Sequence, residues 1–115
     1  MAAIITTLIV IIAMLHLYFL ILEMFLWDKP AGMRAFKLSL EHAQRTKAMA
    51  ANQGLYNGFL SAGLLWGLID YQHNVLVFFL SCVSIAGVFG ALTVSKKIFY
   101  IQALPAIIAL TLLVV

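Results

Sequence analysis

Residues 28–47 read DKPAGMRAFKLSLEHAQRTK and carry five of the seven Lys and Arg residues of the chain. The other two, Lys96 and Lys97, lie between the third and fourth of four long apolar segments. Neither terminus contains a cation, nor does the turn between the second and third segments. Loops rich in Lys and Arg stay in the cytoplasm. The pattern therefore predicts an all-α polytopic membrane protein, a four-transmembrane-helix bundle with both N- and C-termini outside.

The composition supports this class. The chain is 65% hydrophobic and 10% charged, which excludes an ordinary soluble domain. Four spans of about 20 residues nearly exhaust its length, so we expect a single transmembrane domain over residues 1–115. The net charge of +3 suits the anionic lipid bilayer and requires no nucleic-acid partner. Cys82 is the only cysteine, which excludes an intrachain disulfide.

The predicted helices cover about residues 3–27, 40–69, 75–94 and 98–115. Residues 28–39 and 95–97 are the predicted cytoplasmic loops, and the first of them is punctuated by Pro30 and Gly32. Ser39 is the expected N-cap of the second helix. Pro105 cannot donate a backbone hydrogen bond, so we expect a kink in the fourth helix.

Small residues recur at four-residue spacing in the second and third helices, and such stripes let helix backbones approach closely in lipid. They are Gly54, Gly58 and Ala62, then Ala86 with Gly90 and Gly87 with Ala91. On the third helix the stripe fits a parallel homodimer as well as the core of a monomer.

Polar side chains inside apolar segments are costly and tend to mark function. Three of the predicted helices bring them to a matching depth in the cytoplasmic half, which predicts an inner-leaflet polar pocket. The candidate ligand-binding residues are His16, Glu23, Trp27, Asn52, Gln53, Tyr56, Asn57 and Gln102. His16 and Glu23 are seven residues apart, on one helix face, and both side chains can exchange a proton.

Simpler interpretations stand beside this one. Glu23 could reach the cytoplasmic interface or pair with Lys47, and His16 could donate to a backbone carbonyl. The Asn, Gln and Tyr side chains could serve only as hydrogen-bonding glue between helices. A metal held by His16, Glu23 and His42 would match no known spacing, so we predict no metal and no cofactor.

Three motifs carry a family resemblance: HLYFLILEMFLW at residues 16–27, ANQGLYNGF at 51–59 and QALP at 102–105. With these motifs the chain resembles a group of small bacterial four-helix membrane proteins, the domain-of-unknown-function family 1304. The resemblance covers nearly the whole chain. It implies a four-helix fold in the bacterial cytoplasmic (inner) membrane, and it implies no activity.

The leading functional hypothesis is binding or transport of a small amphipathic or lipid-like molecule, with Glu23 and His16 sensitive to protons. The alternative is a membrane-embedded enzyme, an isomerase or hydrolase of an apolar substrate that uses His16 and Glu23 as an acid/base pair. A second alternative is a structural or accessory membrane subunit.

Overall fold

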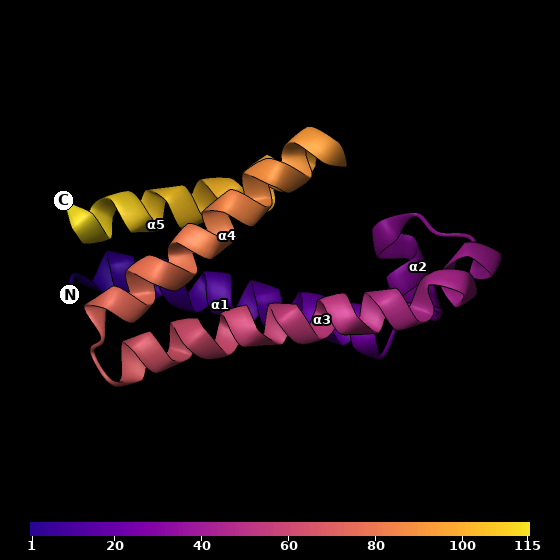
Figure 1. Ribbon diagram of the computed structural model, residues 1–115, viewed down its shortest axis with the longest axis horizontal. Helices are drawn as coiled ribbons and strands as arrows, with labels where there is room; N and C mark the ends of the chain where they lie inside the picture. The colour runs from indigo at the N-terminus through magenta and orange to yellow at the C-terminus, as the bar shows by residue number, and fades with distance from the viewer. The chain divides into compact units, whose positions relative to one another are not determined.

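The computed structural model describes all residues from 1 to 115, and its fold is all-α, as predicted. The elements are α1 (Ala3–Met24), α2 (Pro30–Phe36), α3 (Leu40–Ile69), α4 (His73–Thr93), the π-helix η1 (Phe99–Ala103) and α5 (Leu104–Val114). Figure 1 shows the helices coloured along the chain. The chain forms two compact units. One unit contains residues 1–14 and 60–115, and the other contains residues 15–59. Helices α1 and α3 each contribute to both units.

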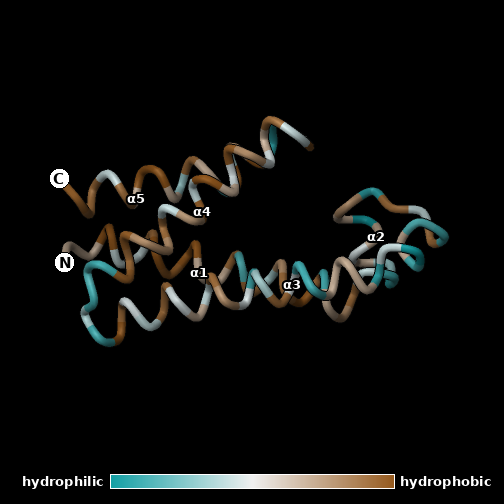
Figure 2. The backbone as a smooth tube through the Cα atoms, in the orientation of Figure 1, coloured by the Kyte–Doolittle hydropathy of each residue, from teal (hydrophilic) through white to brown (hydrophobic).

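Two helices, α1 and α4, are long and apolar enough to cross a membrane. Residues Phe99–Val114 form a shorter apolar helix. Hydropathy along the chain follows this division (Figure 2): α1, α4 and α5 are mostly hydrophobic, whereas hydrophilic residues gather in α2 and at the start of α3. Two of the four predicted spans, α1 and α4, are therefore long and apolar enough for a membrane helix. Helix α3 is continuous over 30 residues, but polar residues in its first half interrupt its apolar sequence.

The predicted loop at residues 28–39 is wrong in one respect, because it contains the short helix α2. Pro30 occupies the first turn, where its missing N–H is not needed. Lys37 ends the helix in the left-handed conformation, with φ of 55°, and donates its backbone N–H to the carbonyl of Met33. A Cβ at Gly32 would lie 2.0 Å from the carbonyl oxygen of Leu26, so only glycine allows this contact with the segment that follows α1.

Helix α1 ends at Met24, three residues before the predicted end at residue 27. The bounds of α3 are the predicted ones. The backbone N–H of His42 donates to Ser39 Oγ at 3.2 Å, which confirms Ser39 as the N-cap.

The unit of residues 1–14 and 60–115 has an aliphatic core. Ile9, Leu64, Leu76 and Leu80 are completely buried in it. The one buried polar link between α1 and α3 here is the Ser61 hydroxyl, which donates to the carbonyl of Ala13 at 2.9 Å.

The fourth predicted helix is divided into η1 and α5. The backbone N–H of Leu104 donates to the carbonyl of Phe99, five residues back, as in a π-helix. Pro105 follows in the first turn of α5 and lacks a backbone N–H. Next to the proline where we predict a kink, the structure has a π-helical segment. Gly87 of α4 packs against it, since a Cβ there would lie 2.6 Å from the backbone nitrogen of Ala103.

Candidate functional site

The central polar contact of the 15–59 unit joins α1 to α3. The amide Nδ2 of Asn57 donates to Oε1 of Glu23 at 2.6 Å. Glu23 lies in the last turn of α1 and is only 4% exposed. The carboxyl has no ion-pair partner, because the single ion pair of the structure lies elsewhere, between Lys47 and Asp28.

Glycines on α3 allow this contact. A Cβ at Gly54 would lie 2.7 Å from Met24 Cγ and 3.0 Å from Glu23 Cβ. One turn later, a Cβ at Gly58 would lie 2.7 Å from Leu20 Cδ1. Asn52, Gln53, Tyr56 and Asn57 form a polar arc on a helical wheel, and the sequence pattern predicts Gly54 and Gly58 on a different side of the helix. In the structure Asn57, at the edge of that arc and about 60° from Gly54 at 100° per residue, faces α1 together with them.

Trp27 anchors the segment after α1 to the start of α3. Its indole N–H donates to Thr46 Oγ1 at 3.0 Å, and the Thr46 hydroxyl donates to the carbonyl of His42 at 2.8 Å. The indole ring also contacts the ring of Phe36 on α2, with centroids 4.9 Å apart. The observed contacts of Trp27 are therefore with α2 and α3. Sequence reasoning missed Thr46 and Phe36, since nothing in the local sequence distinguishes them.

Lys47 bonds to Asp28 and not to Glu23, so one simpler interpretation of Glu23 is wrong. The ammonium of Lys47 lies 3.1 Å from Asp28 Oδ2. This hydrogen bond holds the pKa of Asp28 below its ordinary value.

His16 is completely buried, two turns before Glu23 on α1. Its ring meets that of Phe19 edge to face, with centroids 5.7 Å apart. Seven residues of helix separate the backbones of His16 and Glu23 by about 10.5 Å. The two groups thus share a helix but occupy different surroundings.

The other predicted site residues of α3 make no hydrogen bond to Glu23. Asn52, Gln53 and Tyr56 are exposed, and the ring of Tyr56 contacts Phe59 at 5.5 Å between centroids. Gln102 is half-buried on η1, in the other unit. Their role in ligand binding stays a prediction.

No group of three or more His, Cys, Asp or Glu side chains in the structure could hold a metal ion. The chemistry within reach at Glu23 is that of one carboxyl group and one amide. This pair can accept and donate hydrogen bonds, and its carboxyl can exchange a proton or attract a cation.

Fold and site together define an all-α protein, with two helices that could cross a membrane and a buried carboxyl held by an amide. The chain belongs to the family described as "Protein of unknown function (DUF1304)", whose model matches residues 10–114. The predicted family membership is thereby confirmed. The chain is also similar to "Uncharacterized protein YpaA" of Lactococcus lactis subsp. lactis (strain IL1403), with 29% identity over 104 residues and 87% of each chain covered. No solved structure matches it.

Proposed function

We propose that the chain is a multi-pass protein of the bacterial cytoplasmic membrane that binds or transports a small amphipathic molecule. Residues 28–39 and 95–97 lie in the cytoplasm in this proposal, and Glu23 lies in the inner half of the bilayer. Two observations support this location: the concentration of cations in these two segments and the apolar length of α1 and α4.

The observation that carries the proposal is the buried Glu23 carboxyl with one amide donor and no cation. An isolated ionised carboxylate is expensive to bury, so such a group favours a proton or a cationic partner. Asn57 fixes one carboxyl oxygen and leaves the group able to accept from a ligand. The ligand that fits is a lipophilic molecule with a cationic or hydroxyl end.

The test uses a lipophilic cation, tetraphenylphosphonium, and the full chain in detergent micelles. A cation competes with a proton for the same carboxylate, so the affinity for tetraphenylphosphonium should rise with pH. Glu23→Gln keeps an oxygen that can accept from Asn57 but removes the charge. We expect this variant to bind at least about tenfold more weakly and to lose the pH dependence, a difference of about 1.4 kcal/mol.

The alternatives predict other outcomes. Glu23→Gln with unchanged affinity and unchanged pH dependence would remove Glu23 from the proposed site. A wild-type chain that binds no lipophilic cation at any pH would favour the accessory role. The acid/base alternative gains no support from contacts, because the neighbours described for His16 and Glu23 are different residues.

A further inference from the structure

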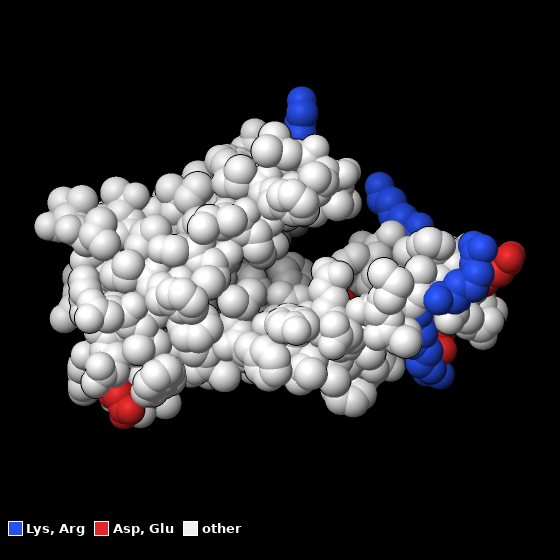
Figure 3. All heavy atoms as spheres, viewed as in Figure 1, with Lys and Arg blue, Asp and Glu red and all other residues white.

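The cations of residues 29–47 form a surface of their own, which we call the basic collar. It consists of Lys29, Arg34, Lys37, Arg45 and Lys47, from α2, its two ends and the first turns of α3. Blue atoms gather over this part of the molecule in Figure 3. Lys47 is paired with Asp28, whereas the other four cations form no ion pair. All five are exposed, and with Asp28 and Glu41 in the same stretch residues 28–47 keep a net charge of 5 − 2 = +3.

The collar is built on a folded support. Gly32 lies against the backbone of Leu26, and Phe36 packs on Trp27. Trp27 is in turn bonded to Thr46 of α3. Arg34 lies on the opposite, exposed side of α2 from the buried Gly32. These contacts hold the cations on a defined surface.

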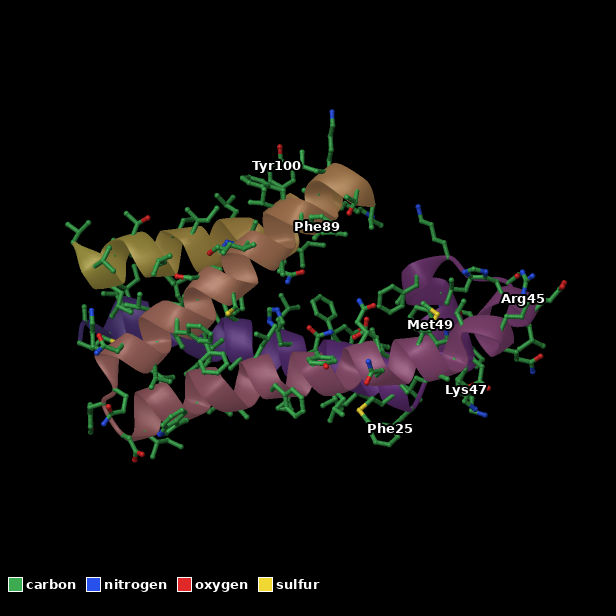
Figure 4. The ribbon with its side chains drawn as sticks, viewed as in Figure 1. Phe25, Arg45, Lys47, Met49, Phe89 and Tyr100 are labelled. Carbon is green, nitrogen blue, oxygen red and sulfur yellow. The ribbon has the colours of Figure 1, made fainter.

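Exposed apolar side chains adjoin the collar. Met49 is 75% exposed, one turn after Arg45 on α3, and Phe25 is 64% exposed directly after α1. Figure 4 labels both side chains, together with Arg45 and Lys47 at the start of α3. Exposed apolar groups thus follow the exposed cations within one turn. This order matches a membrane surface, where charged headgroups give way to apolar acyl chains.

We propose that the basic collar is a docking surface for anionic phospholipid headgroups of the cytoplasmic leaflet. Phosphoryl oxygens of the lipid accept hydrogen bonds from Arg34, Lys37 and Lys29, and the adjoining apolar side chains contact the acyl chains. Charge complementarity supports this partner, and the exposed apolar residues favour a lipid over a soluble anion. The inference rests on the membrane location in the proposed function but not on the role of Glu23.

The experiment titrates the full chain in dodecyl maltoside micelles with short-chain phosphatidylglycerol. Trp66→Phe leaves Trp27, in the support of the collar, as the only tryptophan that reports binding. Phosphatidylglycerol should produce a saturable change in Trp27 fluorescence, and phosphatidylcholine should not. Each cation near an anionic membrane surface contributes about fivefold in affinity, so Arg34→Gln with Lys37→Gln should weaken binding about 25-fold.

The matched control removes two charges elsewhere, with Lys96→Gln and Lys97→Gln. It should weaken binding about twofold or less. An equal loss in both double variants would overturn the proposal, because net charge alone would explain the binding. Saturation by phosphatidylcholine at equal concentration would also overturn it.

Two further ligands test other sources of negative charge. If inorganic phosphate binds as tightly as phosphatidylglycerol, the partner of the collar is a free anion and the lipid proposal is wrong. If a polyglutamate peptide does so, the partner is an acidic protein and the lipid proposal is again wrong. Glu23→Gln should leave phosphatidylglycerol binding unchanged. Failure of the collar and failure of the Glu23 site are therefore observed in separate measurements.

Discussion

Glu23 and Asn57 show which properties of single residues can be predicted from the sequence. Both are polar residues inside apolar helices, so both could be selected as candidates from the sequence. Their bond to each other was not predictable, because it depends on the rotation of α3 relative to α1. Gly54 decides that rotation by allowing the α3 backbone to approach Glu23.

The strength of this contact can be measured with a double-mutant cycle. Asn57→Leu removes the donor from a buried carboxyl and should lower the free energy of unfolding by about 1–3 kcal/mol. Glu23→Leu combined with Asn57→Leu should cost less than the sum of the two single variants, since no polar group is left unpaired. The measurement is unfolding in mixed SDS micelles, followed by far-UV circular dichroism. Additive costs would show that the two side chains do not interact.

Asp28 supplies a control for pH dependence. Its folded-state pKa is lowered by the hydrogen bond from Lys47, so the stability it contributes is present above the ordinary Asp pKa. That contribution is lost only as the pH falls through the lowered value. Asp28→Asn should therefore leave the pH profile of tetraphenylphosphonium binding unchanged. A changed profile would assign the titration to the Asp28–Lys47 pair.

At the scale of elements, α2 and η1 are the departures from prediction. Pro30 and Gly32 are typical of a loop, but Pro30 suits the first turn of a helix and Gly32 allows contact with Leu26. Pro105 predicts a kink, but the choice of a π-helix depends on how the preceding segment packs on α4. Local sequence indicates an irregular position, and only packing selects its geometry.

The contact of α4 with η1 yields an element-scale prediction. Gly87→Ala places a methyl group 2.6 Å from the backbone of Ala103, which cannot move without displacing η1. We expect a loss of about 1–3 kcal/mol in stability. Gly90→Ala is the matched control, because its methyl group meets the side chain of Ile98 at 3.0 Å. Thermal unfolding in micelles should show the larger decrease in Tm for Gly87→Ala.

At the scale of the whole molecule, the proposed topology is open to direct measurement. In a Cys82→Ser background, Gln72→Cys should react with a membrane-impermeant maleimide on intact cells. Ser95→Cys should react only after permeabilisation, because residues 95–97 lie in the cytoplasm in the proposed orientation. The reverse labelling pattern would invert the topology. Labelling of both sites on intact cells would exclude a span between them.

The sequence alone determined the helical class, the family and the approximate bounds of α3, and it selected the candidate site residues. These depend on apolarity, capping groups and motifs, all of which are properties of short stretches of chain. Tertiary structure alone decided that Asn57 bonds to Glu23, that Lys47 bonds to Asp28, and that α2 packs on the segment after α1. Such pairings depend on which backbones approach closely, and that is a property of two segments together rather than of either one.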